Sequence, residues 1–131
     1  MLPPLYAFKQ SLYFKTYKYV FVNQKKEDLI SVLYNNKIPI IFGFNVYDSF
    51  MSNSVANTGI VSYPDTTKEE YLGGHCAVII GYDESTELFT CVNSWGSSWG
   101  NSGLFTMPYK YVLDASLASD FCYLYFTLLK I

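Results

Sequence analysis

Residues 73–103 have the sequence GGHCAVIIGYDESTELFTCVNSWGSSWGNSG, and this stretch decides the fold that the chain is predicted to adopt. Two runs rich in β-branched and apolar residues, 75–82 and 88–93, flank the connection DESTE, which has an ordinary hairpin length. The first run begins with His75, the only histidine, and the second ends with Asn93. The stretch therefore predicts an antiparallel β-hairpin with a histidine and an asparagine at its open end.

The register of this hairpin determines whether the two polar side chains meet. If the connection forms the loop, Tyr82 faces Leu88. The same register sets Ala77 opposite Asn93. Because side chains alternate along a strand, His75 and Asn93 then lie on one face as diagonal neighbours, with Cβ atoms roughly 7 Å apart. A shift of one residue would separate them.

A histidine beside an asparagine suits general-base catalysis. The carboxamide oxygen accepts a hydrogen bond from one ring nitrogen and leaves the other aimed at a nucleophile, without adding charge. The alternative is a histidine that is simply hydrogen-bonded within an apolar core. Gly73 and Gly74 favour the functional interpretation, because glycine inside a sheet is costly unless a backbone or ligand approaches closely.

The composition is that of a packed globular domain. Half of the 131 residues are apolar and 19% are aromatic, unlike a disordered chain. This length suffices for one domain, which we expect to span 1–131. The nine positive charges are all lysine and the net charge is −2, so we expect no nucleic-acid partner.

The apolar runs do not predict a membrane protein. The longest, 38–44 and 121–129, are under half the length of a membrane-spanning helix and are expected to form buried strands. The first ten residues lack the features of a signal peptide, so secretion is not supported and the localisation stays open. We expect no membrane partner, no metal site and no cofactor.

The rest of the chain predicts one main helix and further strands. An amphipathic helix is expected at about 24–35, and 47–72 is expected to be a long loop with at most one short helix and one short strand. A helical turn is expected within 110–119. Strands are expected at 17–22, 39–46, 103–109 and 121–129. This order predicts an α+β fold dominated by a strongly twisted or barrel-like antiparallel sheet.

The motifs GGHCAVIIGYD and NSWGSSWGNSGLFTMPY make the sequence resemble the C-terminal half of a papain-like cysteine peptidase. The resemblance extends through IPIIFGFNVYDSF to ASDFCYLY and covers roughly residues 12–127. Its segment 45–72 is similar to bacterial and viral members. The resemblance implies the right-hand, barrel-like domain of a two-domain enzyme that hydrolyses protein or peptide substrates with a thiol.

The resemblance also implies roles for five residues. His75 would be the catalytic imidazole, and Asn93 would orient it. Trp95 would shield their hydrogen bond and form a wall on the leaving-group side, although simple core packing is an equal alternative for it. Gly73 and Gly74 would bind substrate, with the carbonyl of Gly74 accepting a hydrogen bond at the scissile residue.

The nucleophile of such an enzyme is missing from the sequence. The family places its cysteine about 130 residues or more before the histidine, whereas 74 residues precede His75. We therefore expect the left domain, with the cysteine and the oxyanion glutamine, to lie outside this chain. Cys76 would point away from His75, Cys91 would be buried and inert, and Cys122 lacks an activating context.

Three functions remain open on these observations. The chain is the histidine-bearing part of a peptidase, completed by the missing left domain or by a complementary chain. Alternatively, it is a non-catalytic pseudoenzyme or protein-interaction module that lacks the nucleophile. A tyrosine-rich binding module of unrelated fold is the third, and it requires that His75 and Asn93 do not meet.

Overall fold

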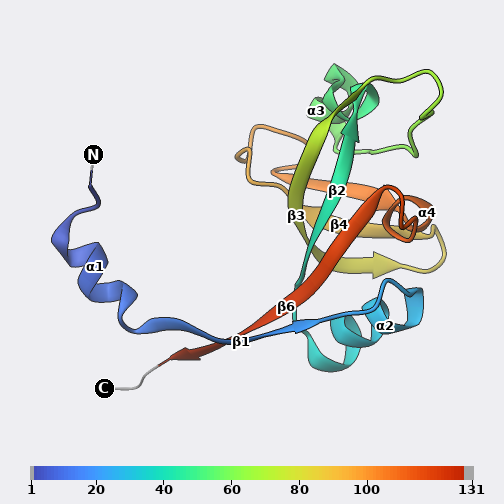
Figure 1. Cartoon of the computed structure of the whole chain (residues 1–131). Coiled ribbons are helices and arrows are strands. Elements are labelled where there is room, and N and C mark those ends of the chain that lie inside the picture. Colours follow the sequence, from blue (N-terminus) through green and yellow to red (C-terminus); the bar gives the residue numbers. More distant parts are fainter. Residues whose placement is uncertain (1, 129–131) are drawn as a thin grey trace.

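A computed structural model describes residues 2–128, without the side chains of 14–17 and 126–128. Its centre is a strongly curved antiparallel sheet of six strands in the order β1-β6-β2-β3-β4-β5 (Figure 1). The strands are β1 (Phe14–Phe21), β2 (Ile40–Tyr47), β3 (Tyr71–Asp83), β4 (Leu88–Val92), β5 (Leu104–Pro108) and β6 (Ala118–Leu128). The predicted α+β class with a twisted antiparallel sheet is confirmed.

Short helical segments connect the strands. They are α1 (Leu5–Ser11), α2 (Lys26–Ser31), the π-helical segment η1 (Val32–Asn36), the 3-10 segment η2 (Asp48–Met51), α3 (Asn53–Thr58) and α4 (Tyr109–Val112). The predicted helix at about 24–35 corresponds to α2 with η1, and α4 falls at the turn expected after β5. No helix in the described part of the chain is long and apolar enough to cross a membrane.

Two helical features differ from the sequence prediction. The segment 47–72 contains two short helical segments rather than at most one. Its helix α3 is specified locally, because the Ser52 hydroxyl accepts from the Val55 N–H and Gly59 ends the helix at a φ of 69°. The helix α1, which precedes the predicted main helix, was not predicted from the sequence.

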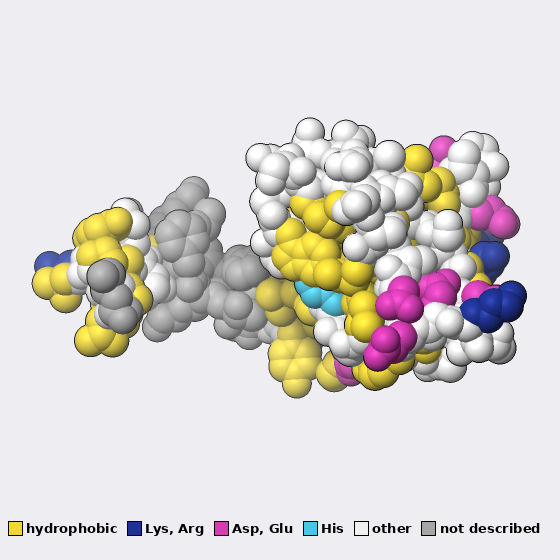
Figure 2. Space-filling view, turned by 90° about the horizontal axis from the view of Figure 1, so that it is seen from above, with side chains coloured by type: hydrophobic (Ala, Val, Ile, Leu, Met, Phe, Trp, Pro, Cys, Tyr) yellow, Lys and Arg dark blue, Asp and Glu magenta, His cyan; other side chains and the backbone are white. Residues whose placement is uncertain are grey.

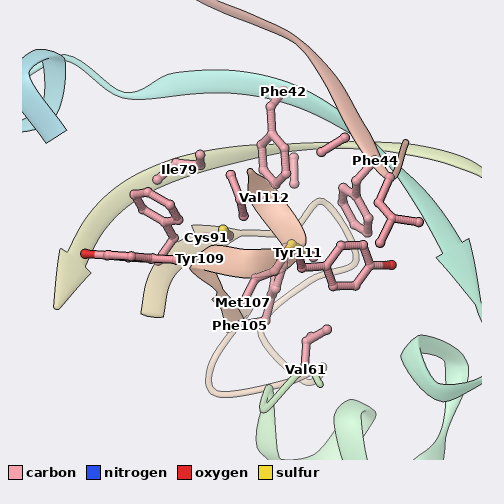
Figure 3. Packing of buried hydrophobic residues seen from close by; sticks show 14 of the residues in the cluster. Phe42, Phe44, Val61, Ile79, Cys91, Phe105, Met107, Tyr109, Tyr111 and Val112 are labelled. Atoms are coloured by element: carbon pink, nitrogen blue, oxygen red, sulfur yellow. The ribbon is translucent and has the colours of Figure 1, made fainter. Parts of the chain in front are cut away.

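The core lies on the concave face of the sheet. Strand β2 alternates between buried and half-buried residues, so every second side chain enters the core. Aromatic rings dominate there: Phe42 stacks on Phe44 at a centroid distance of 5.4 Å, and Phe44 meets Phe50 edge to face at 5.2 Å. Figure 3 shows Phe42 and Phe44 on the same side of the sheet as Tyr111 and Val112 of the short helix α4. This aromatic core supports the strand ends that carry the site.

The hairpin register agrees with the prediction near the site but not near the loop. Val78 pairs with Val92 in the predicted register. A bulge between Ile79 and Gly81 then shifts the pairing, so Tyr82 faces Phe89, and the predicted pairing of Tyr82 with Leu88 is wrong. The extra residue is local to β3 and leaves four residues in the turn. The ends of the strands that hold His75 and Asn93 keep their alignment.

Candidate active site

His75 and Asn93 are hydrogen-bonded to each other. The distance between His75 Nε2 and Asn93 Oδ1 is 2.9 Å. His75 comes from β3 and is half-buried, whereas Asn93 follows β4 and is 8% exposed. The main-chain N–H of Asn93 donates to the carbonyl of Gly103 at 2.9 Å, which holds the asparagine at the strand end. The predicted placement of both side chains on one face is confirmed.

A second hydrogen bond orients the asparagine amide. Asn93 Oδ1 also accepts from the main-chain N–H of Ser94 at 2.8 Å. Because a main-chain N–H can only donate, the atom between Ser94 and His75 must be the amide oxygen. The Nε2 atom of His75 must then be the donor, and the Nδ1 atom of a neutral imidazole carries the free lone pair. The site therefore presents Nδ1 as a base.

The Nδ2 atom of Asn93 shows that the surrounding fold fixes this orientation of the amide. Asn93 Nδ2 is buried and has no hydrogen-bond partner within the described residues. A buried unpaired donor costs about 1–3 kcal/mol. Turning the amide over would aim Nδ2 at the Ser94 N–H and set two donors against each other. The fold therefore keeps the oxygen toward His75 at a cost in stability.

Aromatic side chains enclose the imidazole. The ring centroid of Trp95 lies 4.9 Å from that of His75, and Phe44 meets the imidazole edge to face at 5.5 Å. Trp95 is 39% exposed and packs against Trp99 at 5.1 Å. Figure 2 shows His75 at the surface, next to a patch of apolar side chains. Trp95 is thus a partly exposed ring against the histidine rather than a fully buried core residue.

Glycines shape the loop that carries Trp95. Gly100 has a φ of 62°, and a Cβ at this position would lie 2.5 Å from the carbonyl oxygen of Leu104. The Gly100 N–H donates to the carbonyl of Ala56 at 2.6 Å, which ties this loop to α3. Only glycine satisfies both the left-handed conformation and the close approach. The NSWGSSWGNSG motif is therefore a tight loop that positions the tryptophan.

Gly73 and Gly74 have a different environment. No atom of the described structure lies within 4 Å of the position that a Cβ would occupy at either residue. Gly73 has a φ of 131°, which favours glycine, whereas Gly74 does not have a positive φ. Internal packing therefore does not explain Gly74, which borders open space next to His75. Its assignment to substrate binding stays a prediction.

A hollow of about 450 Å³ lies beside Gly74 and His75. Gly43 lies opposite Cys76 across β2 and β3, and residues 115–120 form the far wall. Hydrogen bonds from Asn45 to Ser116 and Leu117 hold this wall in place. The sequence does not predict this wall, because the wall lies some seventy residues from β2 along the chain and carries no motif. The Asp120 side chain places a carboxylate on it.

None of the three cysteines is placed as the nucleophile. No hydrogen bond joins a thiol to His75 in the described part of the chain. Cys91 is fully buried, and burial raises the pKa of its thiol. Burial also raises the pKa of the half-buried Cys122. Cys76 is exposed and follows His75 directly in β3, which directs it to the opposite face.

The next feature is the arrangement of possible metal ligands in residues 2–128. No group of three or more His, Cys, Asp or Glu side chains there is arranged to hold a metal ion. The site consists of an imidazole oriented by the Asn93 amide, an aromatic wall that includes Trp95, and the adjacent hollow. A general base of this kind can activate a nucleophile that is placed against Nδ1.

Comparisons with known proteins identify the family. The family model for papain family cysteine proteases matches residues 6–124. An uncharacterized peptidase C1-like protein of Acanthamoeba polyphaga mimivirus is 41% identical over 126 residues, which are 91% of this chain and 40% of the relative. A cathepsin B-like cysteine proteinase 3 of Ostertagia ostertagi is 30% identical over 105 residues, or 79% of this chain and 56% of the relative.

A solved structure shows the same fold. Xylellain, a cysteine protease from Xylella fastidiosa, matches with a TM-score of 0.83 and 30% identity, covering 98% of this chain and 46% of that chain. The chain spans between two fifths and three fifths of the length of these relatives. It belongs to the papain family of cysteine proteases.

Proposed function

We propose that this chain is the C-terminal, histidine-bearing half of a papain-like cysteine peptidase. The observation that carries the proposal is the hydrogen bond of 2.9 Å from His75 Nε2 to Asn93 Oδ1, which leaves Nδ1 free as a base. Membership of the papain family supports peptide-bond hydrolysis as the reaction. The nucleophilic cysteine comes from the missing left domain or from a complementary chain.

The geometry suits acyl transfer to a thiol. His75 Nδ1 takes the proton of the incoming thiol, and Asn93 Oδ1 stabilises the resulting imidazolium through the Nε2–H. The thiolate attacks the peptide carbonyl carbon. As the C–N bond breaks, Nδ1–H protonates the leaving amine. Water then attacks the thioester with Nδ1 as base, which releases the acid and restores the thiol.

The surroundings of His75 suggest where the substrate lies. The open space at Gly74 and the hollow beside it would receive the acyl side of a peptide. Trp95, on another side of the imidazole, would bound the leaving-group side. Gly73, which has room beside it, would let the substrate main chain approach β3 closely. We expect proteins or peptides as substrates and no cofactor.

A non-catalytic interaction module is the second candidate. The observation in its favour is that no thiol among the described residues is hydrogen-bonded to His75. In that case the site would bind a peptide or an inhibitor without hydrolysing it. The orientation of Asn93 at the cost of an unpaired buried Nδ2 favours the peptidase, because binding alone does not require a fixed tautomer.

Reconstitution tests the proposal. The chain would be mixed with the part of the mimivirus relative that it does not match, which we propose carries the cysteine. Hydrolysis of a fluorogenic peptide and labelling by a thiol-directed epoxide are expected from the mixture and not from either part alone. The His75→Ala variant should lose both. A complex that forms but neither hydrolyses the peptide nor reacts with the epoxide would contradict the proposed function.

A further inference from the structure

Asn45 lies on β2 between the two sides of the hollow. On one side it pairs with Gly74 of β3, next to His75. On the other side, its main-chain N–H donates to the carbonyl of Leu117 at 2.8 Å, and its side-chain Nδ2 donates to the carbonyl of Ser116 at 3.0 Å. Asn45 therefore joins the part of the sheet that carries His75 to the far wall of the hollow.

The main chain of Asn45 is itself held firmly in place. The hydroxyl of Tyr111 donates to the Asn45 carbonyl, and Tyr111 is only 1% exposed. Figure 3 shows Tyr111 beside Phe44, whose ring it meets edge to face at a centroid distance of 6.1 Å. Both the N–H and the carbonyl of Asn45 are thus hydrogen-bonded. The side-chain amide of Asn45 is therefore presented from a rigid base.

The first part of the wall is a turn that is hydrogen-bonded within itself. The Oδ1 atom of Asp114 accepts from the Ser116 N–H at 2.8 Å and from the Ser116 hydroxyl at 2.6 Å. The carbonyl of Asp114 accepts from the N–H groups of Leu117 and Ala118, both at 2.9 Å. These bonds fix the shape of the turn, but they do not fix its distance from β2.

The side chain of Asn45 reaches the part of the wall that main-chain pairing does not. Strand β6 begins at Ala118, which pairs with Phe44 of β2. One residue earlier, the Leu117 carbonyl still accepts from the main chain of β2. The Ser116 carbonyl accepts instead from the Asn45 side chain. This single side-chain bond therefore sets how far the beginning of the wall stands from β2.

We infer that Asn45 is a positioning residue that sets the width of the hollow and so determines which substrate side chain the hollow accepts. This inference rests on the proposed function, because that function places the acyl side of the peptide in the hollow. Dispersion contacts weaken steeply as a gap opens. One methylene in a fitted pocket changes discrimination by about 10–200-fold. A small outward movement of the wall would therefore reduce the selection between side chains of different size.

Peptide binding to the full chain tests this inference without catalysis. The residues that line the hollow belong to this chain, so binding can be measured before the other half is added. Nitrogen-15 NMR titrations with acetyl-dialanine amide and acetyl-dileucine amide give the two Kd values. Only shifts of the amides of Gly74 and residues 115–120 are used, so that binding elsewhere on the surface does not contribute.

Two variants separate the lost hydrogen bond from a lost side-chain volume. Asn45→Ala removes the donor together with most of the side chain. Asn45→Asp keeps the volume but sets a carboxylate oxygen against the Ser116 carbonyl, so both of these atoms are acceptors. The matched control is Asn35→Ala, because Asn35 Nδ2 also donates at 3.0 Å, to the Ser31 hydroxyl, and does not line the hollow.

The unmodified chain and the Asn35→Ala control are expected to bind the leucine peptide at least about tenfold more tightly than the alanine peptide. In both Asn45 variants this ratio should fall below about threefold, while circular dichroism shows the chain folded. A purely structural role of Asn45 would lower the melting temperature without changing the ratio. An unchanged ratio in Asn45→Asp, or no shifts at the hollow in the unmodified chain, would overturn the inference.

The two proposals fail in different ways. Peptide binding at the hollow with an Asn45-dependent ratio, but without hydrolysis after reconstitution, would refute the proposed function and leave the role of Asn45 standing. In an active reconstituted enzyme, both Asn45 variants should raise KM for leucine substrates more than for alanine substrates. Hydrolysis with an unchanged preference in these variants would refute the positioning role alone.

Discussion

The indole of Trp95 lies against the imidazole of His75 with ring centroids 4.9 Å apart, while Phe44 meets the same imidazole edge to face at 5.5 Å. The tryptophan comes from the glycine-rich loop and the phenylalanine from β2. Together with the hydrogen bond to Asn93, these contacts hold the ring before any nucleophile arrives. A base oriented in advance needs little reorganisation during reaction, which is a general source of catalytic efficiency.

The tautomer of His75 is the first prediction. Nitrogen-15 NMR of the chain, recorded where the ring is neutral, should show the proton on Nε2, because Asn93 Oδ1 is fixed as an acceptor by Ser94. The Asn93→Ala variant should show a mixture of tautomers and should lose activity in the reconstituted peptidase. A proton on Nδ1 in the unmodified chain would contradict the orientation derived for Asn93.

Replacement of His75 should have little effect on stability. The ring is half-buried, and Asn93 Oδ1 keeps its bond from Ser94 when the imidazole is removed. We expect His75→Ala to change the free energy of unfolding by less than about 1 kcal/mol. Phe44→Ala, at a position that is 3% exposed, should cost about 3–5 kcal/mol. Urea midpoints of both variants provide the comparison, and a large loss for His75→Ala would favour a structural core histidine.

Substitution by alanine should destabilise the fold at Gly100 but not at Gly74. Gly100→Ala should destabilise the fold by about 1–3 kcal/mol, because φ is 62° and the new Cβ would lie 2.5 Å from the carbonyl oxygen of Leu104. Gly74→Ala meets open space and should leave the melting temperature unchanged. In the reconstituted enzyme Gly74→Ala should raise KM, because the methyl group occupies the proposed substrate path. Unchanged kinetics would remove Gly74 from substrate binding.

Thiol labelling should separate the three cysteines. Cys76 is exposed and should react quickly with iodoacetamide in the native chain. Burial raises the pKa of Cys122, which lowers its thiolate fraction and should slow its reaction. Cys91 is fully buried with a raised pKa and should react only after denaturation. Mass spectrometry of timed samples gives the order, and rapid native labelling of Cys91 would contradict its assignment as inert.

Local patterns predicted the part of the site that lies on the hairpin. The alternation of side chains in a strand is a local property, so the sequence sufficed to place His75 and Asn93 on one face. The bulge after Ile79 was not predictable, because it depends on how β3 bends around the core. The wall at 115–120 was not predictable either, because hydrogen bonds from Asn45 hold it against β2 across some seventy residues of sequence.

Acid should loosen the wall of the hollow through Asp114. Hydrogen bonds from Ser116 and Tyr63 lower the pKa of its carboxyl, so the charged form is favoured in the folded state. A pKa below its unfolded value adds stability above that value, of about 4, and this stability is lost as pH falls through the folded pKa. In the Asp114→Asn variant the urea midpoint should therefore decrease less as the pH is lowered below about pH 4.

A matched variant distinguishes the wall from a general acid effect. Hydrogen bonds from Ser85 also lower the pKa of Asp83, which lies at the β3–β4 turn, away from the hollow. Asp83→Asn should also make the urea midpoint depend less on pH below about pH 4. It should leave the KM of the reconstituted peptidase unchanged. Asp114→Asn should raise KM at neutral pH, because Asp114 anchors Ser116 at the edge of the hollow. Equal KM values for the two variants would show that this wall does not contact the substrate.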